Sequence, residues 1–195
     1  MTVTDITRSL SKSTTEHAFN GIVPDSIHEA RVRRIKHPEL LSTDPLDAGN
    51  TIHGLLSRMA DNDPLTPVES AHFPWVSSLR RLVWGLGADQ MDIDVALSAH
   101  GHVPHGTCDL LVYGGPKPRG ILEVKVIAKG AKSSPRARDL VQLAAYARLC
   151  AGRGSFDDLW AGLAYLELET RMVRLMVYNN ARDIIVPALP FLRAA

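Results

Sequence analysis

Three charged side chains interrupt two apolar stretches of the sequence. Asp109 lies within G-T-C-D-L-L-V-Y, and Glu123 and Lys125 lie two residues apart within G-I-L-E-V-K-V. Apolar and β-branched residues fill both stretches and a Gly-Gly-Pro turn segment separates them, so they predict two short strands. Because side chains alternate along a strand, we expect Glu123 and Lys125 on one face and Val124 on the other.

These residue types suit one kind of chemistry. A buried carboxylate without a partner is costly, and two carboxylates on adjacent strands can instead hold a hard divalent cation such as Mg²⁺. A lysine beside them can orient or deprotonate a water molecule and offset charge that develops on a phosphate. Taken alone, the three residues also fit the alternative of a simple ion pair across the strands.

The spacing of these residues resembles a family signature. Asp109, followed after thirteen residues by Glu123-Val124-Lys125, resembles the D…(D/E)-x-K signature of the PD-(D/E)XK nuclease superfamily. The following Q-L-A-A-Y segment, with Gln142 and Tyr146, is similar to the Q-x-x-x-Y motif of its RecB-like exonuclease branch. This resemblance implies an α/β fold with a restriction-endonuclease-like core and metal-dependent hydrolysis of DNA.

A third segment, G-N-T-I-H-G-L-L, resembles the helical G-x-x-x-H motif that precedes the strands in RecB-like nucleases, where the histidine ligates the metal. The alternative for this histidine, His53, is a structural position in the core, where its ring nitrogens have hydrogen-bond partners. The resemblance implies a set of ligands for Mg²⁺ or Mn²⁺: His53, Asp109, Glu123 and the backbone carbonyl of Val124. It also implies that Asp109, Glu123 and Lys125 are catalytic, and that Gln142 and Tyr146 contact the substrate strand.

The distribution of charge is consistent with a polyanionic substrate. The 195-residue chain has a net charge of only +1, so affinity for nucleic acid must come from local clusters. Between residues 114 and 138 there is one acid, Glu123, and a run of basic residues, namely Lys117, Arg119, Lys125, Lys129, Lys132, Arg136 and Arg138. We expect Arg138, Lys129 and Lys132 to contact the substrate, although basic loops are also common as solvated surface.

Several classes of protein are not expected. The two cysteines, Cys108 and Cys150, are too few for an Fe–S cluster or a structural zinc site. A phosphate-binding G-x-x-x-x-G-K-[ST] sequence is absent, so no ATP cofactor is expected. No apolar run is long enough to span a bilayer and the start has no apolar segment typical of a signal peptide, so we expect a cytoplasmic protein without membrane contact.

The remaining segments predict the supporting elements. Residues 1–24 are expected to be a mobile arm or an edge-packed segment, and residues 24–41 a short basic helix with Val32 and Ile35 inward. Asp44 as N-cap followed by Pro45 predicts a helix that carries His53. Residues 61–74 are expected to be a loop with a short helical turn after a T-P-V-E capping box, followed by an amphipathic helix from W-V-S-S-L-R-R-L.

The segment M-D-I-D-V-A-L-S-A-H alternates and predicts a further strand, with Asp92 and Asp94 on one face and Ile93 and Val95 on the other. These two acids are expected to face solvent. The alternative is that they lie behind the metal ligands and orient them without contacting the metal. The apolar C-terminal tail, broken by two prolines, is expected either to pack back on the domain or to contact a partner or a second copy.

The order of elements, α-β-β-β-α-β-β, predicts an α/β protein with a mixed central sheet of about five strands flanked by helices. We expect an N-terminal arm and short basic helix over residues 1–41 and a single nuclease domain over residues 42–195. The expected activity is that of a Mg²⁺- or Mn²⁺-dependent exonuclease acting on DNA ends or single strands. The alternatives are a restriction-like endonuclease, which would normally need a dimer, and an inactive nucleic-acid-binding module of the same fold.

Overall fold

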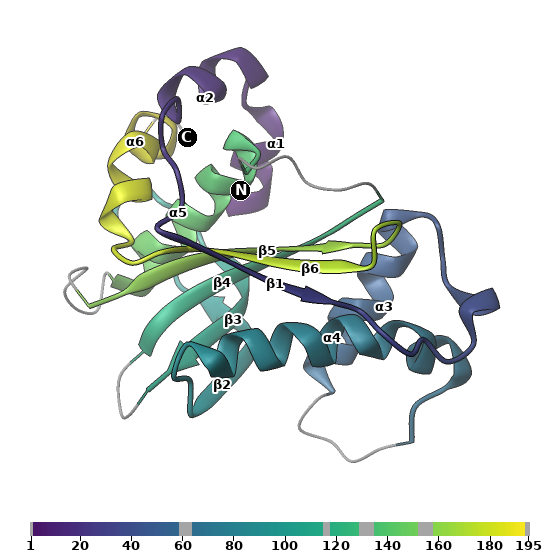
Figure 1. Ribbon diagram of the computed structural model, residues 1–195. Coiled ribbons are helices and arrows are strands. Elements are labelled where there is room, and N and C mark those ends of the chain that lie inside the picture. Colours follow the sequence, from purple (N-terminus) through teal and green to yellow (C-terminus); the bar gives the residue numbers. More distant parts are fainter. Residues whose placement is uncertain (1, 59–63, 115–117, 129–134, 152–157, 194–195) are drawn as a thin grey trace.

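The computed structural model describes residues 2–58, 64–114, 118–128, 135–151 and 158–193, and it shows one mixed sheet with helices on both faces (Figure 1). The strands are β1 (Ser26–Arg31), β2 (Gln90–Leu97), β3 (Gly106–Tyr113), β4 (Pro118–Ile127), β5 (Trp160–Glu167) and β6 (Met172–Tyr178). The helices are α1 (Val3–Ser9), α2 (Lys12–Ala18), the 3₁₀ helix η1 (Pro38–Leu40), α3 (Pro45–Ser57), α4 (Pro67–Gly85), α5 (Ala137–Ala151) and α6 (Arg182–Arg193). The predicted α/β architecture is confirmed, with six strands instead of about five.

The strands lie in the order β1-β6-β5-β4-β3-β2. β4 and β5 are parallel and are connected through α5, whereas all other neighbours are antiparallel. α1, α2, α5 and α6 cover one face of the sheet, and α3 and α4 cover the other (Figure 1). Each face buries its own apolar cluster, so the interior strands β3 and β4 are enclosed on both sides.

Local signals fix where the two helices of the second face begin. The Asp44 side chain accepts a hydrogen bond from the Leu46 N–H (2.8 Å) at the start of α3, as predicted. Thr66 and Glu69 form the predicted capping box at the start of α4. The loop prediction for the residues that follow is wrong, because α4 continues without interruption through Pro74. Burial of the turn before this proline against the sheet offsets the backbone hydrogen bond that proline cannot make.

The helix predicted over residues 24–41 is also wrong. Residues 26–31 form β1, an edge strand that pairs antiparallel with β6 from Ser26↔Val177 to Arg31↔Met172. The free edge of β6 offers backbone donors and acceptors along its whole length, and pairing with them satisfies the backbone groups of β1. Val32 is buried and Ile35 partly buried against the α4 cluster, so these two side chains point inward as expected.

The N-terminal residues are folded rather than a mobile arm. Thr2 and Asp5 form a capping box at the start of α1, and Val3 and Ile6 are buried. The Val3 N–H also donates to the carbonyl of His105 (3.2 Å), just before β3. α1 is thereby attached to the beginning of a central strand.

The C-terminal tail packs back on the domain, which is one of the two expected outcomes. It forms α6, which lies along α5 and buries Ile184, Ala188 and Leu192 in the cluster of that face. Its two prolines lie inside the helix. None of the helices in the described residues has the length and apolar character needed to cross a membrane.

Candidate active site

The β3–β4 hairpin opens into a fork, and the candidate residues lie at this fork. Paired residues run from the turn as far as Leu110↔Leu122 and then stop. Beyond that point β3 continues beside β2, and β4 continues beside β5. Asp109 and Glu123 are the next residue on each strand, so the divergence places their carboxylates where the backbones separate.

The side chain of Asp109 holds the fork together. Its Oδ2 accepts the backbone N–H of Val124 at 2.6 Å, which replaces the lost strand pairing with a bond to a charged acceptor. Its Oδ1 lies 3.4 Å from Nδ1 of His53, on α3. One carboxylate therefore connects β3, β4 and α3.

A change of face in the β2–β3 pair brings a further acid to this place. Ile93 and Leu110 pack in the cluster of α3 and α4, but Val95 and Cys108, the next cross-strand pair, pack in the cluster of α5. Between them Asp94 has φ of 51°, in the left-handed region that Asp tolerates better than most residues. The prediction that Ile93 and Val95 share a face is wrong because this residue interrupts the alternation.

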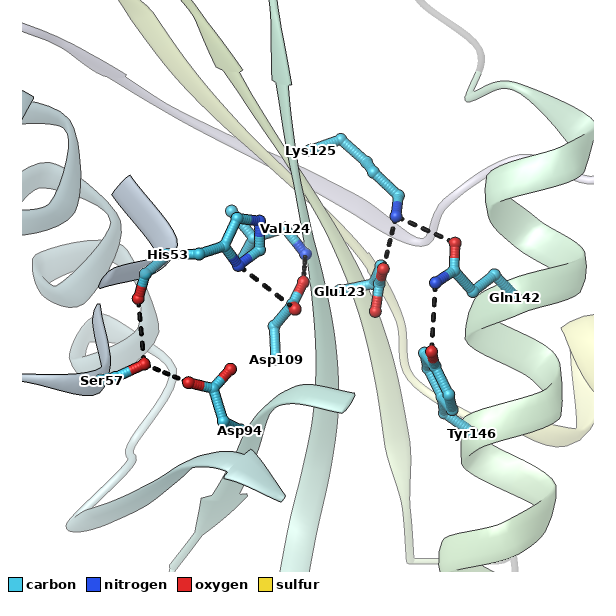
Figure 2. A network of polar contacts seen from close by, with 9 residues as sticks. All are labelled: His53, Ser57, Asp94, Asp109, Glu123, Val124, Lys125, Gln142 and Tyr146. Carbon is cyan, nitrogen blue, oxygen red and sulfur yellow. Dashed lines mark hydrogen bonds and ion pairs between the residues drawn. The ribbon is translucent and has the colours of Figure 1, made fainter. Parts of the chain in front are cut away.

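Asp94 therefore turns toward α3 and the fork. Ser57 Oγ lies in contact with Asp94 Oδ2 and 3.1 Å from the His53 carbonyl, as Figure 2 shows. One ligand atom from each of His53, Asp94 and Asp109 lies within 4.8 Å of the other two, a spacing at which a single cation can be shared. Glu123 is not a member of this group of three.

Glu123 and Lys125 lie on the α5 side of β4, as expected from their spacing, and Val124 is buried on the α3 and α4 side. Lys125 Nζ donates to Glu123 Oε1 (2.5 Å). The other carboxylate oxygen, Oε2, is buried and has no hydrogen-bond partner among the residues that the structure describes. Since Glu123 is only 3% exposed, this leaves half of a carboxylate desolvated and unsatisfied.

Gln142 and Tyr146 on α5 continue the chain of contacts from Lys125 (Figure 2). Gln142 Oε1 accepts from Lys125 Nζ (2.9 Å), and Gln142 Nε2 donates to the Tyr146 hydroxyl (3.2 Å). Tyr146 is 2% exposed, and its ring packs in the core of that face. The ring is therefore part of the core, and contact of Tyr146 with a substrate strand stays a prediction.

Burial and like charges shift the titration of these groups. Burial, followed by the charge of Asp109, raises the pKa of Glu123 to about 8. Burial also raises the pKa of Asp109, against the opposing effects of His53 and the Val124 N–H. For Lys125 burial alone would lower the pKa, but the adjacent Glu123 carboxylate raises it above the ordinary value. Lys125 is therefore an ammonium at neutral pH.

The arrangement fits a divalent cation. Carboxylates, one imidazole and a backbone carbonyl are ligands that Mg²⁺ and Mn²⁺ accept. The unsatisfied Oε2 of Glu123 and the raised pKa values of both buried carboxyls show that burial leaves the ionised carboxylates poorly stabilised, and a bound cation would stabilise them. The free thiol of Cys108 is buried beside them and its pKa is raised to about 12, first by burial and then by Glu123, so it is a poor metal ligand or nucleophile.

The sequence identified most of the residues that meet here. Asp109, Val124 and His53 come together on one side of β4, and Glu123, Lys125, Gln142 and Tyr146 on the other. The sequence missed Asp94 as a candidate ligand. Asp94 and Asp109 both lie between the cross-strand pairs Ile93↔Leu110 and Val95↔Cys108, and this placement depends on the tertiary structure. Arg138 is exposed in the first turn of α5, whereas Lys129 and Lys132 lie outside the described residues.

Comparison with known proteins adds evidence on the fold. No protein-family model and no curated protein matches the sequence. The structure is similar to the crystal structure of a protein named "Putative exonuclease" from Eubacterium rectale, with a TM-score of 0.53 and 13% sequence identity over 79% of this chain. The matched region spans 65% of that protein, which is less than two thirds of its length. At this level of identity the likeness shows a shared fold.

Proposed function

We propose that the protein is a metal-dependent nuclease that hydrolyses phosphodiester bonds in DNA. The observation that carries this proposal is the fork itself: the buried Glu123 has one oxygen on Lys125 and one oxygen unsatisfied, and on the other side of β4 Asp109 contacts His53. A carboxylate left half unsatisfied costs stability in a purely structural site. It is suited, however, to receive a cation together with the phosphate that the cation binds.

Each residue of the fork has a proposed role. The cation ligands would be His53, Asp94, Asp109, Glu123 and the backbone carbonyl of Val124. A bound divalent ion would supply Lewis acidity toward a phosphate oxygen and lower the pKa of a bound water. The Lys125 ammonium would orient the attacking water by hydrogen bonding and offset the negative charge of the phosphate. Gln142, held by Tyr146, would fix the position of Nζ.

We further propose that the enzyme is an exonuclease acting on ends or single strands. The H…D…E-V-K…Q-x-x-x-Y motifs resemble those of RecB-like exonucleases, and the Eubacterium rectale protein of similar fold is named as an exonuclease. The reaction needs no ATP, since hydrolysis of a phosphodiester is favourable by itself. Two alternatives are tested beside this proposal: a restriction-like endonuclease and a non-catalytic binding module.

The test uses end-labelled linear DNA and covalently closed circular DNA of the same sequence, each incubated with Mg²⁺, Mn²⁺ or EDTA. We expect linear DNA to be degraded with either metal, circles to be spared, and EDTA to stop the reaction. Asp109→Asn and Glu123→Gln should abolish cleavage. Glu39→Gln, which changes an exposed carboxylate in η1, serves as the control and should cleave like the wild type.

The other outcomes are equally informative. Equal cutting of circles and linear DNA would replace the exonuclease assignment with an endonuclease. DNA binding without cleavage in any metal would leave a binding module. Cleavage by Asp109→Asn and Glu123→Gln at the wild-type rate would refute the proposed site.

A further inference from the structure

A cleft of about 1090 Å³ lies at the C-terminal end of β4. Its walls are α2, the first residue of α3, the end of β4 and the first turn of α5. Ile127, two residues after Lys125 and therefore on the same face of β4, lines it. Small-molecule pockets have volumes of about 300–1,000 Å³, so this cleft has room for a larger ligand that continues along β4 toward Lys125.

The charged side chains at the cleft are mainly basic. Among the described residues that line it, the charged ones are Lys12, Arg136, Arg138 and one acid, Glu16, which lies 3.7 Å from Lys12. The side chains of Arg136 and Arg138 are exposed. The excess of positive charge favours an anionic ligand such as a phosphodiester backbone.

The backbone that carries the two arginines is fixed before any ligand binds. The Arg136 N–H donates to the hydroxyl of Tyr165 (2.9 Å), and this hydroxyl donates to Asp139 Oδ2 (2.7 Å). Tyr165 and Asp139 are both buried. The hydrogen bonds therefore anchor the start of α5 to β5, and binding would cost little additional backbone entropy there.

Part of the cleft wall is apolar. It consists of Phe19, Ile22 and Val23, which follow α2, and Val23 is 71% exposed. An apolar wall beside basic side chains matches a ligand that carries flat apolar groups as well as phosphates. Unpaired bases of a single strand have this character, whereas the bases of a duplex are stacked and paired inside the helix.

We propose that this cleft binds single-stranded nucleic acid and leads the strand to Lys125 and Glu123. Arg136, Arg138 and Lys12 bind phosphates, and the apolar wall contacts bases. This inference rests on the proposed nuclease function, because it specifies the form in which the substrate reaches the site. It also assigns the N-terminal helix α2, which carries no recognisable motif, to substrate binding.

The test measures binding apart from cleavage. The fluorescence anisotropy of a labelled oligothymidylate is followed in EDTA for the wild type, for Arg136→Ala/Arg138→Ala, and for Arg31→Ala/Arg33→Ala as the control. The control removes the same charge from exposed arginines outside the cleft. Thermal unfolding of both variants checks that the fold is intact.

We expect the cleft variant to bind roughly tenfold more weakly at physiological salt, and the slope of log K against log salt to decrease by about 1.4, since each phosphate contact to a single strand contributes about 0.7. The control should retain the wild-type affinity and slope. A blunt duplex should compete poorly with the labelled strand.

Unchanged affinity and slope in the cleft variant, or an equal loss in the control, would overturn the proposal. Equal competition by the blunt duplex would overturn the preference for single strands. The nuclease assignment is judged separately. If the cleft variant loses binding but the wild type fails to cleave DNA with either Mg²⁺ or Mn²⁺, the cleft proposal stands and the catalytic proposal fails. If the wild type cleaves and the cleft variant binds normally, the reverse holds.

Discussion

At the scale of single residues, Glu123 determines the charge state of the fork. Burial and the neighbouring Asp109 raise its pKa to about 8, so in the metal-free protein it keeps its proton through neutral pH. Ligation of a cation requires the carboxylate, so metal binding should release a proton. The folding free energy of the metal-free protein should depend on pH for the same reason.

With EDTA present, we expect the free energy of unfolding to fall as the pH rises from about 5 to about 8. The unfolded chain loses the Glu123 proton near the ordinary value of 4.5, whereas the folded chain holds it until about 8. The folded state therefore binds more protons in this window, and each rise in pH favours unfolding, by at most about 1.4 kcal/mol per pH unit for one group. Urea denaturation at several pH values measures this slope.

Glu123→Gln cannot ionise and should flatten this slope, while Glu39→Gln should retain it. A slope that is unchanged in Glu123→Gln would show that the carboxyl group ionises normally in the folded protein.

Asp94 allows a second prediction at this scale. If it is a cation ligand, Asp94→Asn should weaken Mn²⁺ binding roughly tenfold or more, because loss of even an indirect contact to a metal commonly costs about 10–100-fold. Asparagine also tolerates a left-handed backbone, so the fold should persist. Isothermal titration with Mn²⁺ gives the affinity. Asp92→Asn, two residues away on β2, is the matched control and should bind Mn²⁺ normally, and a similar loss in both variants would argue for a general charge effect.

At the scale of elements, α5 positions Lys125. It presents Gln142 to the ammonium and Tyr146 to Gln142, it packs along α6, and its first turn is held by the Tyr165–Asp139 hydrogen bond. Gln142 and Tyr146 are therefore directed toward Lys125 and the sheet. Their effect on catalysis should pass through the orientation of Lys125.

Tyr146→Phe preserves the buried ring and removes only the hydroxyl that Gln142 binds. We expect kcat to fall while the affinity for DNA in EDTA stays unchanged. The free energy of unfolding should change by about 1 kcal/mol, the usual net contribution of one hydrogen bond. Single-turnover kinetics and anisotropy separate the two effects. Weaker DNA binding with normal kcat would instead support direct contact between Tyr146 and the substrate.

At the scale of the whole molecule, the N-terminal helices join the sheet at Gly106. A Cβ at this position would lie 2.7 Å from Tyr146 Cε1 and 3.2 Å from Val3 Cβ. α1, β3 and α5 thus meet where only glycine fits. The close approach connects the N-terminus to the helix that positions Lys125.

Gly106→Ala should therefore destabilise the protein by about 1–3 kcal/mol through overpacking. The matched control is Gly54→Ala, because Gly54 lies in α3 with nothing within 4 Å of the added methyl group. There alanine should stabilise the helix by about 0.5–1 kcal/mol. Chemical denaturation compares both variants with the wild type. If Gly106→Ala were as stable as Gly54→Ala, α1 and Tyr146 would be able to move away from the added methyl group at no cost in free energy.

The sequence by itself determined the features that depend on nearest neighbours along the chain. Asp44 and Pro45 start α3 because a cap and a fixed φ act within one turn. Glu123 and Lys125 share a face of β4 because alternation is a property of any extended strand. The same local regularity, together with the family resemblance, indicated His53, Asp109 and Gln142.

Only the tertiary structure decided the features that depend on contacts between distant segments. Residues 26–31 form a strand because β6 has a free edge to pair with. α4 passes through Pro74 because the residues on either side of it, among them His72 and Trp75, are buried. Asp94 reaches the fork because its left-handed backbone reverses the faces of β2, which alternation along the sequence cannot reveal. The fork arises because β3 stays paired with β2 and β4 stays paired with β5, while the pairing between β3 and β4 ends. The twist of the sheet separates the two strand pairs at that point.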